Sequence, residues 1–314
     1  MPQRSLQLVS LLLLVLLSIG TLSSCAGSGA PRGLNGETLL RAPITGERRL
    51  RMEAQLAEAR ERHRAAPEDE EAIVWLGRRL AYLARYAEAL EVYGEGLRRH
   101  PDSVRLLRHR GHRYITTRRL EDAVFDLTRA AELARGVPDA IEPDGQPNPD
   151  GVPIGTTRGN VLYHLGLAHY LRGDFEAALA AYDERAAETD RNDDNRVSTA
   201  YWRYLCLRRL GRDAEAAATV DAIGEDLELY ENFGYHRLCL LYAGRLTPSQ
   251  VAMDGDGIHT RSVANATTAY GIAMHAWFAG DEEAAETDWR AILREPGAID
   301  AFGRIAAEVE LARL

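Results

Sequence analysis

Apolar residues recur every three or four positions from about Leu50 to the C-terminus, and no stretch alternates with a period of two. The first spacing is typical of amphipathic helices, whereas alternation is typical of half-buried strands. One long interruption, rich in Pro and Gly, lies between residues 136 and 158. The pattern predicts an all-α chain of consecutive helices, with residues 136–158 as an insertion between them.

The helical region repeats itself. Three copies share a glycine in a first helix and an alanine in a second, in the pairs Gly77 and Ala89, Gly111 and Ala123, and Gly166 and Ala178. Ala89 and Ala123 lie 34 residues apart, and Ala178 follows after 55, which is one repeat plus 21 residues. Later copies are marked by turns at Gly211, Gly244 and Gly280. We expect the small residues where helices cross, and the turn glycines in the left-handed conformation that ends a helix.

This pattern resembles the tetratricopeptide repeat (TPR), a helix–turn–helix unit of about 34 residues. The resemblance implies an α-solenoid of about five to six repeats closed by a C-terminal capping helix. It places the first repeats at 51–135, and further repeats with the capping helix at 159–314. Because TPR first helices line a concave groove that binds peptides, it also implies a protein–protein interaction scaffold and not an enzyme.

The family's groove positions are the second, fifth, ninth, twelfth and thirteenth of each repeat. Carried onto this chain, the resemblance implies a groove that is basic at one end and aromatic at the other, with Arg105, Arg108, His112, Asn160, Tyr163, Tyr170, Tyr201, Arg208, Tyr270, Met274 and Trp277. Arginine and aromatic residues are enriched in binding hot spots. The alternative is that Tyr163, Tyr201 and Tyr270 belong to the core between repeats, because a helix phase shifted by one residue would turn them inward.

The insertion at 136–158 contains five prolines, which make it stiff and non-helical: Pro138, Pro143, Pro147, Pro149 and Pro153. Long loops inside compact domains are usually functional or disordered. Contact with a partner and a plain inter-repeat linker both remain open from the sequence.

The N-terminus carries a processing signal. Arg4 precedes an apolar run from Leu6 to Ile19, and Leu22-Ser23-Ser24-Cys25 follows it. This ending resembles a bacterial lipoprotein box, which implies a signal peptide at 1–24, Cys25 acylated with fatty acids such as palmitate, and a flexible tether at 25–50. In such lipoproteins an Asp directly after the cysteine retains the protein at the inner membrane. This chain has Ala26 there, so the expected localisation is the periplasmic face of the outer membrane. An uncleaved N-terminal anchor is the alternative.

The net charge of −9 argues against nucleic acid, so another protein or a peptide segment is the expected partner besides the membrane. Cys206 and Cys239 occupy equivalent places in neighbouring repeats. Stacked helices lie about 8–10 Å apart, farther than the Cα atoms of a disulfide allow, so we expect two buried thiols.

No cofactor, metal or catalytic motif stands out. His109 and His112 can share a helix face, but no further ligand motif accompanies them. Asp254-Gly255-Asp256-Gly257 opens like a calcium loop, yet the twelfth position is Asn265 where Glu is required. The alternative function is a receptor for a small molecule or metal, in a pocket formed by Tyr163, His164, Tyr201 and the insertion.

Overall fold

In the computed structural model, the described residues are 31–39, 43–188, 192–253, 261–294 and 299–314. These ranges hold no strand, only isolated bridges between Arg32 and Thr38 and between Ile141 and Thr156. The helices are α1 (Gly46–Ala65), α2 (Glu70–Tyr82), α3 (Tyr86–Arg99), α4 (Val104–Thr116), α5 (Leu120–Ala134), α6 (Thr157–Arg172), α7 (Phe175–Glu188), α8 (Asp193–Arg209), α9 (Asp213–Asp221), α10 (Phe233–Tyr242), α11 (Pro248–Met253), α12 (Arg261–Phe278), α13 (Glu282–Arg294) and α14 (Phe302–Arg313).

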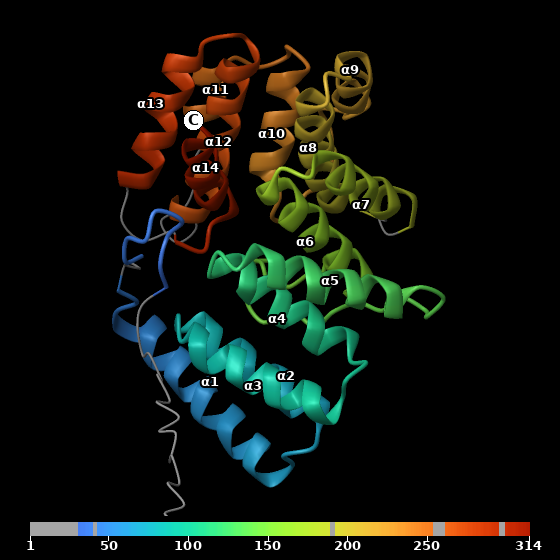
Figure 1. Ribbon diagram of the computed structural model, residues 1–314, viewed down its shortest axis with the longest axis vertical. Helices are drawn as coiled ribbons and strands as arrows, with labels where there is room; N and C mark the ends of the chain where they lie inside the picture. Colours follow the sequence, from blue (N-terminus) through green and yellow to red (C-terminus); the bar gives the residue numbers. More distant parts are fainter. Residues whose placement is uncertain (1–30, 40–42, 189–191, 254–260, 295–298) are drawn as a thin grey trace, which may run out of the picture.

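From α2 to α13, consecutive helices pack as pairs, and each pair stacks on the next (Figure 1). Helix α1 precedes the first pair, and α14 packs on α12 and α13 at the other end. The predicted all-α solenoid with a C-terminal capping helix is confirmed.

Small residues stand where the two helices of a pair cross, as the repeat pattern predicts. A Cβ on Gly77 would lie 2.2 Å from the Tyr93 ring, and one on Gly166 would lie 2.6 Å from the Tyr182 ring. Ala89 is fully buried at the matching crossing of the first pair. The two distances for Gly77 and Gly166 are shorter than real Cβ atoms allow, so these glycines let the two helices of each pair approach as closely as they do.

The turns inside the pairs end the first helix in the left-handed conformation. Four carry glycine, with φ of 91° at Gly173, 69° at Gly211, 72° at Gly244 and 86° at Gly280. In the first two pairs the same turn position holds Ala84 at φ 60° and Arg118 at φ 62°. This conformation brings Cβ too close to the carbonyl that follows, so these two positions carry backbone strain that the glycines avoid.

The two ends of the solenoid meet at a surface that we call the seam. Leu39 is buried in the same cluster as Ile299, and the backbone N–H of Leu34 donates to Glu308 of α14. Arg118, in the turn between α4 and α5, forms an ion pair of 2.8 Å with the same Glu308. Figure 1 shows the N-terminal segment, in blue, beside the base of the red C-terminal helices. Gly33 and Leu39 are therefore buried within the segment expected as a tether at 25–50, while most of its neighbours between residues 31 and 39 are exposed.

Cys206 and Cys239 are free and buried, as expected. None of the helices in the described ranges has the length and apolarity needed to cross a bilayer. The expected signal peptide at 1–24 with Cys25, and the loop at 254–257 that resembles the start of a calcium site, lie outside the described residues.

Candidate functional site on the inner face

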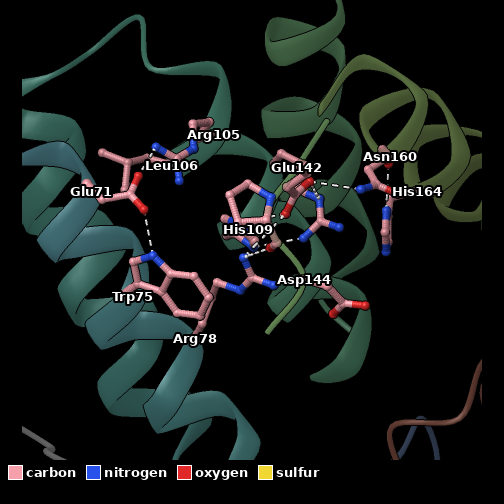
Figure 2. Close-up of polar contacts among 12 residues, drawn as sticks. Glu71, Trp75, Arg78, Arg105, Leu106, His109, Glu142, Asp144, Asn160 and His164 are labelled. Atoms are coloured by element: carbon pink, nitrogen blue, oxygen red, sulfur yellow. Dashed lines mark hydrogen bonds and ion pairs between the residues drawn. The ribbon is translucent and has the colours of Figure 1, made fainter. Parts of the chain in front are cut away.

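Side chains from three successive first helices converge on one carboxylate, and we call the surface they form the inner face (Figure 2). Arg78 of α2 lies 3.8 Å from a Glu142 oxygen, and Arg108 Nε of α4 lies 3.4 Å from the other. The amide of Asn160, on α6, donates to Glu142 at 2.8 Å. His109 Nε2 lies 3.2 Å from Glu142 Oε1. Four polar side chains thus surround a carboxylate that is 6% exposed.

Glu142 belongs to the insertion. Its outgoing part at 140–145, the first limb, and its returning part at 152–157, the second limb, pair with each other where they meet the helices. The Glu142 N–H donates to the Gly155 carbonyl, and the Thr157 N–H donates to the Ala140 carbonyl, both at 2.9 Å. The antiparallel bridge between Ile141 and Thr156 lies between these bonds. The first limb therefore enters the inner face as an extended segment.

The inner face also holds the backbone of this limb. Arg78 donates to the Pro143 carbonyl at 2.7 Å, and Arg79 donates to the Gly145 carbonyl at 3.1 Å. A Cβ on Gly145 would lie 2.1 Å from the Tyr82 hydroxyl, so a larger residue here would have to displace the ends of the Tyr82 and Arg78 side chains. A hydrogen bond from arginine to a backbone carbonyl does not depend on the side chain of the residue that carries the carbonyl. Such bonds therefore suit the binding of an extended peptide.

The second limb crosses to the fourth pair. The Ile154 carbonyl accepts from the side-chain amides of Asn192 and Asn195, each at 3.0 Å. Between the limbs, the Asn148 side chain closes the loop by bonding the Val152 carbonyl and N–H. The insertion therefore lies over α2, α4, α6 and α8, and it is not a plain linker.

Electrostatics fix the charge states around Glu142. Burial alone would raise the pKa of Glu142, but Arg108 and His109 outweigh it and hold that pKa well below its usual range. Burial, with Arg108 beside it, lowers the pKa of His109 to about 3. The centre is therefore an ionised carboxylate held by arginines and a neutral histidine.

Two further histidines lie next to each other on the inner face. The rings of His112 and His164 are 4.3 Å apart, and Phe302 of α14 lies against both. Burial lowers the pKa of both histidines well below the ordinary value; Arg113 adds to the effect on His112 and Arg108 to that on His164. His164 also hydrogen-bonds the Asn160 carbonyl at 2.6 Å.

Helix α14 fills the part of the inner face beyond the insertion. Glu310 accepts from Tyr270 at 3.0 Å and lies 2.5 Å from Arg209 of α8. Arg313 donates to the carbonyls of Tyr170 and Leu171 at the end of α6, each at 3.0 Å. The capping helix is thus both the end of the solenoid and a cover for its inner face.

The eleven groove residues expected from the sequence divide into three groups. Arg108, His112, Asn160 and Tyr163 lie around the insertion and Phe302. Arg105, Arg208 and Trp277 remain partly exposed, beside Glu71, Asp213 and Arg209 respectively. Tyr170, Tyr201, Tyr270 and Met274 are fully buried. For these four the expectation of an open groove is corrected: α14 and the neighbouring repeats cover them, so they are core in this conformation.

The pocket expected around Tyr163, His164 and Tyr201 is filled by side chains of the chain itself. The Tyr163 hydroxyl bonds that of Tyr235 at 2.7 Å and accepts from Trp202 at 3.2 Å. No group of three or more His, Cys, Asp or Glu residues suited to a metal ion occurs in the described part of the chain.

Sequence reasoning missed Arg78, Tyr82 and Glu142. Arg78 directly follows Gly77, as His112 follows Gly111, so extending the groove register to the first repeat finds it. Tyr82 occupies the thirteenth position of that same repeat. Glu142 gave no such signal, because nothing in a proline-rich loop tells which carboxylate turns inward.

No family model matches this chain, and no curated protein matches it. Among solved structures it is similar to YrrB, described as a TPR protein with an unusual peptide-binding site, at 13% identity and a TM-score of 0.42 over 82% of this chain and 98% of that one. A tetratricopeptide repeat protein from Parabacteroides merdae ATCC 43184 has 14% identity and a TM-score of 0.48, with coverages of 82% and 93%. The complex of Naa15/Naa10 bound to HypK-THB gives 14%, a TM-score of 0.37, and coverages of 82% and 36%.

Proposed function

We propose that this chain is a protein–protein interaction scaffold that holds an extended segment of a partner on its inner face. One observation carries the proposal: the inner face holds an extended stretch of polypeptide, through a buried carboxylate and two backbone carbonyls. Charge-assisted bonds of this kind are the strong and directional ones in peptide recognition. Repeat solenoids use such surfaces for binding because each repeat contributes a few side chains to one continuous face.

A photo-crosslinking amino acid placed in living cells tests the proposal. It replaces Arg105, which is partly exposed on α4, the helix that also carries Arg108, and as a matched control Glu95, which is exposed on α3. We expect a discrete adduct with one protein from position 105 and none from position 95. Equal adducts from both positions, or none from either, would contradict a scaffold that works through the inner face.

We further propose that acylation of Cys25 anchors the scaffold to a membrane of the bacterial envelope. The support is the sequence from Arg4 to Cys25, whose small residues before the cysteine match a lipoprotein signal. The wild-type chain is expected to sediment with membranes and to incorporate a labelled fatty acid. Cys25→Ala should lose the label, and retention of the label in this variant would contradict the proposal.

A further inference from the structure

We infer that residues 140–155 are a displaceable internal ligand, and that the place they occupy takes an extended acidic segment of a partner protein, with a carboxylate where Glu142 now lies. This inference rests on the proposed function and names both its partner class and its regulation.

The insertion is held mainly by polar contacts. In this it resembles a bound peptide and differs from a helix of the hydrophobic core. Its carboxylate and its backbone carbonyls make the contacts to α2, α4 and α6. Its apolar side chains contribute little to the hold on these helices, because Ile141 is 54% exposed, and Ile154, although buried, belongs to neither hydrophobic core cluster. A competing segment that offers the same carboxylate and carbonyls replaces these contacts without opening the hydrophobic core.

The charge of the site specifies an acidic occupant. Arg78, Arg79 and Arg108 all lie against the first limb, and the carboxylate within ion-pair distance of Arg78 and Arg108 is that of Glu142. Emptying the site would leave buried arginine charge without compensation, which is costly in a protein interior. An incoming segment must therefore bring its own carboxylate, and a neutral or basic one is rejected.

Attachment to the chain sets the strength of competition. A short tether gives an internal ligand an effective concentration on the order of millimolar. The apparent affinity for an outside segment equals its intrinsic affinity multiplied by the fraction of molecules in which the site is empty. The insertion thus excludes weak or neutral segments and admits an acidic one that is tight or locally concentrated.

The experiment refills the site from outside. The probe is a fluorescent peptide with the sequence of residues 138–157, and the readout is anisotropy with the full chain in detergent. In the emptied variant, Gly-Ser-Gly replaces residues 142–155. The replacement can be short because Ile141 and Thr156 are paired across an antiparallel bridge, where Cα atoms lie about 5 Å apart. We expect the emptied variant to bind the peptide at least about tenfold more tightly than the intact chain.

Peptide variants test the anchor. A Glu142→Gln peptide is expected to bind the emptied variant at least about tenfold more weakly, because it loses the charge-assisted contacts. An Asp150→Asn peptide is the matched control and should bind like the unchanged peptide, since Asp150 is exposed in the insertion. Equal binding by the Glu142→Gln peptide and the unchanged peptide overturns the inference, as does a folded emptied variant that binds neither.

A second variant covers the case in which the emptied chain does not fold. Glu142→Gln in the intact chain loosens the internal ligand, so it should bind the unchanged peptide more tightly than wild type and exchange the backbone amide hydrogen of residue 142 faster. Equal affinity and equal exchange overturn the inference. Failure of the proposed function is separate: it shows as a missing cellular adduct at position 105, whatever the peptide does.

Discussion

Arg118 and Glu308 are 190 residues apart in the sequence and form a buried ion pair that joins the second helix pair to the last helix. Arg118 also donates to the carbonyls of Thr116 and Ile299, and Glu308 accepts the N–H of Leu34. The Arg118–Glu308 pair therefore joins the turn between α4 and α5, the C-terminal segment from Ile299 to α14, and the N-terminal segment at Leu34.

Breaking this pair is expected to be among the most damaging single changes in the seam. Arg118→Met leaves Glu308 buried and uncompensated, which should lower the free energy of unfolding by about 3–5 kcal/mol. The double change Arg118→Met with Glu308→Leu should recover much of the loss. Denaturant unfolding measures both, and Arg129→Met, in an exposed pair with Asp102, is the control that should leave the midpoint unchanged. A midpoint that is also unchanged in Arg118→Met would contradict the role of the seam.

A glycine at the strained turn of the first pair is expected to stabilise the protein. Ala84 has φ 60°, so Ala84→Gly relieves a left-handed strain of about 1 kcal/mol, partly offset by the greater freedom of glycine when unfolded. Arg118→Gly relieves the same strain but loses the ion pair, so it should be destabilising. Thermal melts compare the two, and a lower midpoint for Ala84→Gly would contradict the strain argument.

The docking of α14 depends on Gly303. A Cβ there would lie 2.3 Å from the Ala266 carbonyl oxygen, and backbone cannot move aside as a flexible side chain can. Gly303→Ala should therefore cost about 1–3 kcal/mol and increase hydrogen exchange in α14. Gly94→Ala is the matched control, because its nearest neighbour is 3.9 Å away and alanine favours a helix by about 1 kcal/mol. Equal midpoints for both variants would show that the contact does not hold α14.

Stability should fall as the pH drops below about 6.5. Burial lowers the pKa of His109, His112 and His164 in the folded chain, so protons bind the unfolded chain first. Each such histidine costs about 1.4 kcal/mol per pH unit between the unfolded pKa near 6.5 and its own folded pKa. The Glu142 carboxylate acts in the same direction below about pH 4.3, because its folded pKa is also lowered.

Melts between pH 7.5 and 5 measure this dependence. His112→Phe keeps the contacts with the His164 and Phe302 rings and removes one titrating group, so it should flatten the slope by about one proton. A wild-type midpoint that does not change with pH would contradict the buried neutral histidines.

Features set by local spacing could be predicted from the sequence. The glycine–alanine crossings and the turn glycines each depend on residues within one repeat, so the repeat pattern reveals them. The thiols at Cys206 and Cys239 followed from the distance between stacked helices. The same register placed Arg108 and Asn160 on one face, and the structure brings both to Glu142.

Features set by the closing of the solenoid could not be predicted. Tyr170 and Tyr270 are buried because α14 returns across α6, which depends on small rotations summed over many repeats. The role of Arg118 carries no local sequence signal, because its partner Glu308 is at the other end of the chain. The partners of Glu142 are likewise fixed by how α2, α4 and α6 stack, and no spacing within the insertion encodes that.

The seam changes how this chain should unfold. Open repeat arrays lose their terminal repeats first, since each repeat contacts only its neighbours. Here the first described residues lie against the last helix, so neither end can fray without releasing the other. The contacts of the seam span most of the chain, which makes them slow to form, because a long loop must close before they are made. Folding should therefore be cooperative, and the contacts of the seam should form last, after the stack of helix pairs between the two ends is complete.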